Sequence, residues 1–244
     1  ATGVALATAA WPIDFELVER WTFQDNRLGS SSSGEDAALP NIISSHLPTG
    51  HAIELPANSR FIKLGDQHAL VLKETIDAQV VNDFREVDYP KESLTAIATV
   101  RIDKEQPWGG LMSMMQDNGS YERGWLLGFQ KRQFGFAVKA EQGDPGLSWA
   151  LSDKLFQPGT WYQVVGTYDG SQTSLYVNGE LVAQHEKQMG PIDYPDEAAF
   201  QLASYRDKDE HHYGSGKLHG LALGKRALSA AEVQRLYELT CESF

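Results

Sequence analysis

Apolar and polar residues alternate along residues 93–102 more regularly than anywhere else in the chain. Because successive side chains of a strand point to opposite sides, this pattern predicts a strand with one buried face. A shift of one residue would expose the whole apolar set, so the register is strongly specified. Ile97 interrupts the polar face, which also carries Thr95, Thr99 and Arg101. The face expected to be buried carries Leu94, Ala96, Ala98, Val100 and Ile102.

A second region, residues 161–183, predicts three strands joined by two tight turns. Aromatic and β-branched residues dominate 161–168, and residues 173–177 alternate between apolar and polar. Asp169-Gly170 separates these two strands, since glycine accepts a positive φ without steric cost. Asn178-Gly179 is the strongest short signal for a two-residue hairpin turn. The return strand is expected at 180–183, which completes an antiparallel meander.

Short strand patterns recur over the rest of the chain and are separated by turn residues. Repeated short strands with almost no helix favour a two-layer antiparallel sandwich. No internal repeat or linker is visible, so we expect a single domain over residues 1–244, with its core at about 16–240. The further strands are expected at 17–24, 52–55, 61–64, 109–116, 124–129 and 134–139.

One helix is predicted, near the C-terminus. Ser229 is placed as its N-cap, and Glu232 stands three residues later, as in a capping box. Leu228 and Val233 have the spacing of a hydrophobic staple, and Leu236 extends the apolar face. We expect this helix to close an open edge or end of the sandwich.

The meander also carries a family resemblance. Three of its segments resemble the signature hairpins of laminin-G-like domains, within the concanavalin A-like lectin/glucanase superfamily. These segments are Trp161-Tyr162, Val164-Val165-Gly166-Thr167-Tyr168-Asp169-Gly170 and Leu175-Tyr176-Val177-Asn178-Gly179-Glu180-Leu181. Segments 20–23, 217–220 and 227–233 are similar to the opening strand, closing strand and terminal helix of that family. The resemblance implies an all-β, antiparallel jelly-roll β-sandwich with one short C-terminal helix. It does not specify a function, because lectins, adhesion modules and glycan-cleaving enzymes share this fold.

Composition narrows the classes of partner and the cellular location. The net charge of -12 disfavours nucleic acid and anionic membranes, and no apolar run approaches the ~20 residues of a membrane span. The single cysteine, Cys241, excludes an internal disulfide. Residues 1–10 resemble the end of a secretory signal, with an artificial chain boundary or an edge strand as equal alternatives. The family resemblance implies a secreted, periplasmic or cell-surface protein.

Calcium is the cofactor that two acidic segments suggest. The ion takes six to eight oxygen ligands, usually gathered on loops. In pentraxins, calcium-dependent relatives with the same fold, an Asp-Asn pair occupies a place similar to that of Asp117 and Asn118. A second acidic segment of pentraxins falls roughly where Asp207 and Asp209 lie. The resemblance therefore implies Asp117, Asn118, Asp207 and Asp209 as metal ligands, whereas solvated acidic loops are the alternative.

Aromatic residues beside the predicted loops are candidates for sugar binding. A pyranose ring stacks its C–H surface on an aromatic face, and polar neighbours hold its hydroxyl groups. Many of these rings will instead fill the core. The aromatics beside loops are Trp108, Tyr121, Trp149, Tyr205 and Tyr213, and from these we predict ligand binding by Trp108, Tyr121, Tyr205 and Tyr213.

Catalytic motifs of this fold are not found in the sequence. Jelly-roll glucanases carry Glu-x-Asp-x-x-Glu on one strand, and the nearest match, which begins at Glu86 and Asp88, ends in Lys91. The Tyr/His pair that a lyase of this fold needs occurs together only in residues 211–213. No catalytic residue is therefore predicted.

The sequence favours a non-catalytic carbohydrate-binding domain with a glycan or polysaccharide as partner. We expect it to belong to a larger secreted bacterial protein, with a possible neighbouring enzyme domain in the same chain. Two alternatives stay open: a protein-interaction or spacer domain appended to a hydrolase, and an unrecognised glycan hydrolase or lyase.

Overall fold

Antiparallel strands make up most of the computed structural model. The structure describes residues 13–22, 42–43, 51–55, 60–64, 67–72, 78–80, 89–196, 199–206 and 210–240. Within these ranges the strands form two large sheets and two small ribbons, and one helix follows near the C-terminus. The predicted all-β sandwich with one short C-terminal helix is confirmed.

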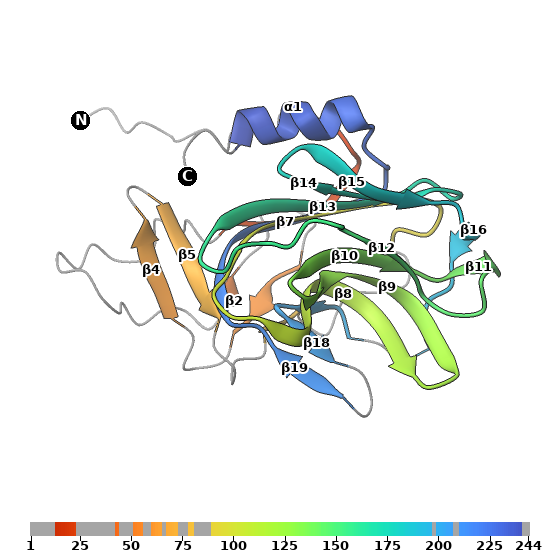
Figure 1. Cartoon of the computed structure of the whole chain (residues 1–244), viewed down its shortest axis with the longest axis horizontal. Helices are drawn as coiled ribbons and strands as arrows, with labels where there is room; N and C mark the ends of the chain where they lie inside the picture. Colours follow the sequence, from red (N-terminus) through yellow and green to blue (C-terminus); the bar gives the residue numbers. More distant parts are fainter. Residues whose placement is uncertain are drawn as a thin grey trace.

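The first large sheet forms the upper layer in Figure 1. Its strands run in the order β15-β14-β13-β7-β20-β5-β4, and β1 pairs with β20 as well. Strand β7 lies inside the sheet, with β13 and β20 as its neighbours. The members are β1 (Leu17–Thr22), β4 (Arg60–Leu64), β5 (Gln67–Leu72), β7 (Leu94–Ile102), β13 (Trp161–Tyr168), β14 (Thr173–Val177), β15 (Glu180–His185) and β20 (Gly216–Gly224).

The second large sheet lies below the first in Figure 1, in the order β12-β10-β9-β8-β17-β6-β3-β2. Two ribbons of two strands each, β11 with β16 and β18 with β19, complete the described strands. The sheet consists of β2 (Ile42–Ile43), β3 (Ile53–Glu54), β6 (Ala78–Val80), β8 (Gln106–Asn118), β9 (Tyr121–Lys131), β10 (Gln133–Val138), β12 (Ser148–Leu151) and β17 (Gln201–Leu202). The ribbons are β11 (Ala140–Gly143), β16 (Gln188–Ile192), β18 (Ser204–Arg206) and β19 (His211–Tyr213).

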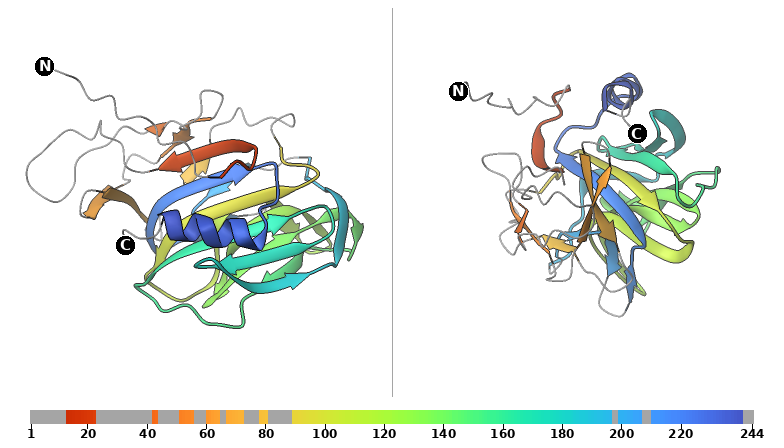
Figure 2. Two further views of the ribbon diagram at one scale, coloured as in Figure 1. Left: turned by 90° about the horizontal axis from the view of Figure 1, so that it is seen from above. Right: turned by 90° about the vertical axis from the view of Figure 1, so that its left-hand side faces the viewer.

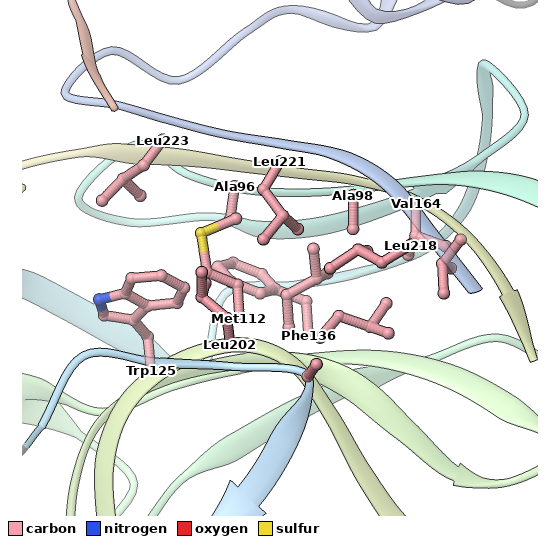
Figure 3. Packing of buried hydrophobic residues seen from close by; sticks show 14 of the residues in the cluster. Ala96, Ala98, Met112, Trp125, Phe136, Val164, Leu202, Leu218, Leu221 and Leu223 are labelled. Atoms are coloured by element: carbon pink, nitrogen blue, oxygen red, sulfur yellow. The ribbon is translucent and has the colours of Figure 1, made fainter. Parts of the chain in front are cut away.

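The main core lies between the two sheets (Figure 3). All five residues predicted for the buried face of β7 belong to it. Trp125 and Phe136 enter from the second sheet and are fully buried. The Phe136 ring lies against Gly166, where an added Cβ would come within 2.4 Å of it. The small residues of β7 and β13 therefore leave the space that the large rings of the second sheet fill.

The turn between β14 and β15 has the predicted hairpin geometry. Asn178 and Gly179 have φ values of 51° and 81°, and Val177 pairs with Glu180 across the turn. Positive φ at both central residues is what a type I′ turn requires, and its twist matches that of the flanking strands. The Asn-Gly prediction is confirmed.

Helix α1 (Ala230–Thr240) covers the outer face of the first sheet (Figures 1 and 2). Its Val233 and Leu236 pack in a cluster with Ile97 of β7 and Val165 of β13. Ile97 thus interrupts the polar face of β7 because that face is also buried. The expectation that the helix closes an edge or end was wrong, since these contacts lie on the face of the sheet. No helix of the described residues is long and apolar enough to cross a membrane.

The capping box of α1 forms as predicted. The Ser229 backbone N–H donates to Glu232 Oε2 at 2.9 Å, and the Glu232 N–H donates to Ser229 Oγ at 3.4 Å. Glu232 also pairs with the Arg226 guanidinium at 2.9 Å. Arg226, and then the Ser229 N–H, lower the pKa of Glu232 from 4.5 to about 2. One carboxylate therefore fastens both the first turn of α1 and the connection from β20.

We predict that Glu232→Gln lowers the free energy of unfolding at neutral pH by about 0.5–1 kcal/mol, because glutamine can still accept the Ser229 N–H bond but loses the charge that pairs with Arg226 and favours the helix N-terminus. The pKa of Glu232 is depressed in the folded state, so its contribution is complete above about 4.5 and is lost as pH falls toward 2. Urea unfolding across that range measures the effect. The variant should lose less stability on acidification than the wild type. Glu238→Gln, at an exposed position of the same helix, is the control, and an unchanged pH profile for Glu232→Gln would contradict the assignment.

Candidate functional site

A row of glycines crosses the outer face of the second sheet. Gly110 of β8 pairs with Gly128 of β9, which pairs with Gly135 of β10. A Cβ on Gly135 would lie 2.9 Å from a ring atom of Trp149, and one on Gly110 would lie 1.9 Å from the carbonyl oxygen of Ser204. The missing side chains therefore let Trp149 lie close to the sheet at one end of the row, and let β18 approach it at the other.

Trp149 belongs to a group of three aromatic rings. The Trp108 ring centroid lies 5.7 Å from that of Trp149 and 5.8 Å from that of Tyr205. The two tryptophans come from β8 and β12, which are three inter-strand spacings, or about 14 Å, apart. Their side chains thus converge across β9 and β10. Both tryptophans are half-buried, so part of their ring surface faces solvent.

Tyr205 is the buried member of this group. Its side chain is only 3% exposed, and its hydroxyl donates to Asp117 Oδ2 at 2.9 Å. The His212 ring lies 5.7 Å away, on the partner strand of the β18–β19 ribbon. The ribbon therefore holds Tyr205 against Trp108, and the solvent-facing aromatic surface belongs to Trp108 and Trp149. We call these three rings, Trp108, Trp149 and Tyr205, the aromatic group.

Two carboxylates lie on the same face of the sheet. Asp117 and Glu122 are direct partners across β8 and β9. Asp117 accepts a hydrogen bond from the Tyr205 hydroxyl, and Glu122 Oε2 accepts one from the backbone N–H of Leu147 at 2.5 Å. Each carboxylate thus fastens a segment that borders the aromatic group: the β18–β19 ribbon in one case and the connection before β12 in the other. Together they make this end of the face acidic.

The predicted sugar-binding residues do not all meet here. Trp108 and Tyr205 do, whereas Tyr121 lies at the β8–β9 hairpin, 36% exposed, with the Arg123 guanidinium 4.9 Å from its ring centroid. Tyr213 is the last residue of β19, and its side chain is not described.

Trp149 is not among the predicted ligand-binding residues, because the alternation of its strand by itself would place the large residues inward. In β12 the small residues Ser148 and Ala150 are buried, while Trp149 and Leu151 are on the other face and half-buried. Large apolar residues on the outward face, with small ones inward, reverse the usual pattern of a sandwich strand. Such a reversal marks an outer face with its own apolar contacts.

The predicted calcium ligands are only partly described. Asp117 and Asn118 end β8 within the strand ladder, and Asp117 already accepts the Tyr205 hydroxyl. Asp207 and Asp209 fall outside the described residues. No group of three or more His, Cys, Asp or Glu that could hold a metal ion occurs among the residues described. Asp117 and Asn118 alone do not make a calcium site, because the ion needs at least six oxygens.

Family comparison identifies the class of protein. Residues 76–234 match the model of the concanavalin A-like lectin/glucanases superfamily, and the chain belongs to this superfamily. Pappalysin-1 of Mus musculus and of Homo sapiens are each 23% identical to the chain over 159 residues, 61% of the chain and 10% of theirs. The chain therefore spans about a tenth of the length of these curated relatives.

Solved structures with low sequence identity share the fold. Domain 4 of AbnA, a GH43 extracellular arabinanase from Geobacillus stearothermophilus solved with arabinotriose, has a TM-score of 0.67 at 11% identity, covering 92% of this chain and 100% of that one. The Ruminococcus gnavus IT-sialidase CBM40 bound to α2,3-sialyllactose has a TM-score of 0.59 at 14% identity, covering 69% and 96%. The binding domain of Paraclostridial Mosquitocidal Protein 1 has a TM-score of 0.64 at 14% identity, covering 93% and 53%.

We predict that Tyr205→Phe lowers the free energy of unfolding by about 1 kcal/mol, because Asp117 loses a hydrogen-bond donor. Urea unfolding at neutral pH measures this. Tyr121→Phe is the matched control: the Tyr121 ring is exposed and its hydroxyl donates to no described residue, so its removal should change the free energy little. Equal effects of the two variants would show that the Tyr205 hydroxyl does not anchor the ribbon.

Proposed function

We propose that the domain is a non-catalytic carbohydrate-binding module whose glycan lies across Trp108 and Trp149 on the outer face of the second sheet. The observation that carries the proposal is the pair of half-buried rings, 5.7 Å apart, beside a row of glycines. Aromatic faces of this kind stack on the C–H surface of sugar rings. Helix α1 lies on the opposite side of the molecule and leaves this face uncovered (Figure 1).

Polar side chains beside the glycine row suit sugar hydroxyl groups. Gln130 and Gln133 pair with each other two residues beyond Gly128 and Gly135, on the same face. The Gln133 amide nitrogen donates to the Ser152 carbonyl oxygen, and this bond orients the side chain. A primary amide can donate and accept at once, as a sugar hydroxyl does. The face thus combines an apolar platform with at least one oriented amide.

The charge of the face favours an uncharged glycan. Asp117 and Glu122 lie on it, and the chain as a whole carries a net charge of -12. An anionic sugar would be repelled by both carboxylates at close range. We therefore assign neutral glycans as the ligand class.

The domain belongs, in this proposal, to a larger secreted bacterial protein with a neighbouring enzyme domain. Two comparisons support the arrangement. The chain matches only a tenth of pappalysin-1, and AbnA carries a domain of this fold within an extracellular arabinanase. A module that binds glycan without cleaving it would keep such an enzyme near its substrate.

We predict that Trp149→Ala and Trp108→Ala each weaken glycan binding at least about tenfold, as the loss of a central aromatic anchor does. Titration calorimetry with arabinotriose and a panel of neutral oligosaccharides measures the affinity, and α2,3-sialyllactose serves as the anionic comparison, which should bind more weakly.

Trp161→Ala is the matched control for this experiment. Trp161 is also half-buried, but it lies in the first sheet beside His219. The control should bind as the wild type does, and circular dichroism should show that all three variants are folded. Unchanged affinity in Trp149→Ala would contradict the placement of the glycan on the aromatic group, and no binding of any neutral glycan by the wild type would favour the interaction or spacer alternative.

We extend the proposal to calcium, with Asp207 and Asp209 joining Asp117 and Asn118 at the hairpin end of the second sheet. A bound ion stabilises the folded state by mass action, so calcium chloride should raise the melting temperature and a chelator should reverse the rise. Asp207→Asn with Asp209→Asn should abolish the rise without removing the bond between Tyr205 and Asp117. If the wild type shows no calcium-dependent shift, the calcium part fails and glycan binding stands on its own test.

A further inference from the structure

A row of polar residues crosses the outer face of the first sheet beside α1. Thr95 of β7 pairs with Thr167 of β13, Thr167 pairs with Ser174 of β14, and Ser174 pairs with Gln184 of β15. The Thr95 hydroxyl donates to the Arg226 carbonyl oxygen at 2.7 Å and accepts the Leu228 N–H at 3.0 Å. Thr95 is therefore polar because it holds the connection between β20 and α1.

The other residues of the row, Thr167, Ser174 and Gln184, do not hold another segment in this way. Thr167 and Ser174 are only 4% and 3% exposed, yet their hydroxyls bond to none of the residues that the structure describes. The Gln184 side chain is exposed and likewise has no partner among them. Neither hydroxyl oxygen is among the fully buried side-chain atoms that lack a partner in the described residues, so both can be reached from outside. The two hydroxyls and the amide are thus available to bond to water or to a ligand.

These side chains open onto a hollow of about 400 Å³ between the start of α1 and strands β14 and β15. Tyr176 and Leu181 line it as well, and they pair with each other across β14 and β15. Tyr176 ends the apolar row beneath the helix, and Leu181 is 45% exposed. The hollow therefore has an apolar wall on one side and a wall of hydroxyls and an amide on the other.

The charged groups at the hollow are already engaged. The Arg226 guanidinium makes two hydrogen bonds to the Glu232 carboxylate, at 2.9 and 3.1 Å. Asp169 accepts the backbone N–H groups of Ser171 and Gln172. Glu232 also caps the first turn of α1, so the positive end of the helix already has its carboxylate. With two carboxylates and one guanidinium, the lining does not suit an anion.

We propose that this hollow is a second ligand site, which takes an uncharged sugar ring. A pyranose or furanose has an apolar C–H face and a rim of hydroxyl groups. In the hollow, the C–H face would lie against Tyr176 and Leu181, and the rim would bond to Thr167, Ser174 and Gln184. This inference does not depend on the aromatic group, because the two sites lie on the outer faces of different sheets. A domain with both sites would connect two glycan chains.

The test uses the double variant Thr167→Val with Ser174→Ala, which removes both hydroxyls and nearly keeps the shape. The probes are glucose, galactose, mannose and arabinose, added singly at millimolar concentrations to ¹⁵N-labelled protein, with citrate as the anionic comparison. At least one sugar should shift the amide resonances of Thr167, Ser174 and Gln184 in the wild type. Its affinity should fall about tenfold or more in the double variant, as expected for two lost hydrogen bonds.

Two further measurements separate this site from a structural role and from the aromatic group. Without sugar, the double variant should resist urea at least as well as the wild type, because the lost hydroxyls have no described protein partner. Trp149→Ala should leave the sugar-induced shifts at Thr167 and Ser174 unchanged. The proposal is overturned if no sugar shifts these resonances, if only citrate does, if the double variant binds sugar like the wild type, or if it is clearly destabilised.

Discussion

The mutual burial of the two inner sheet faces is the contact on which the rest of the molecule depends. Apolar side chains from β7, β13 and β20 meet large rings and methionines from β8, β9 and β10 (Figure 3). Burying a large apolar side chain stabilises the fold by about 1.5–3 kcal/mol. A strand that slipped by one residue would turn this set outward, so the core fixes the register of every paired strand. The register in turn fixes which residues lie on the outer faces, where both candidate sites are found.

The two outer faces are completed in different ways. On the first sheet, the apolar side of α1 packs on Ile97 and Val165 and buries them. On the second sheet no described helix covers the face. Trp149 lies over Gly135, and the β18–β19 ribbon holds Tyr205 against Trp108. Apolar surface that is only half covered by the chain itself is a common mark of a binding surface.

A binding surface differs from a packed surface in having polar or aromatic groups that make few contacts within the protein itself. The Tyr205 hydroxyl, Asp117 and Glu122 are all bonded within the protein and serve its architecture. The solvent-facing parts of the Trp108 and Trp149 rings and the hydroxyls of Thr167 and Ser174 are not used in contacts within the described part of the chain. Proteins keep such groups where function needs them. Superfamily membership alone does not assign a ligand, because one sandwich supports many activities.

Features that depend on residues close together in the chain could be predicted from the sequence. The alternation of β7, the Asn178-Gly179 turn and the capping box of Ser229 and Glu232 all formed as predicted, since the pattern for each lies within a short stretch of the chain. The predicted strands at 109–116 and 124–129 were shorter than β8 and β9. The apolar pattern ends before the strands do, because the hydrogen bonds between the strands continue into their polar ends.

The tertiary structure alone decided which distant residues became neighbours. Gly110, Gly128 and Gly135 form a row only because β8, β9 and β10 pair in one register. Trp149 meets Trp108 across two intervening strands, and Thr167 and Ser174 line one hollow together with the start of α1. Local periodicity predicts which side of a strand a residue occupies. What covers that side depends on long-range packing, for which the sequence carries no local signal.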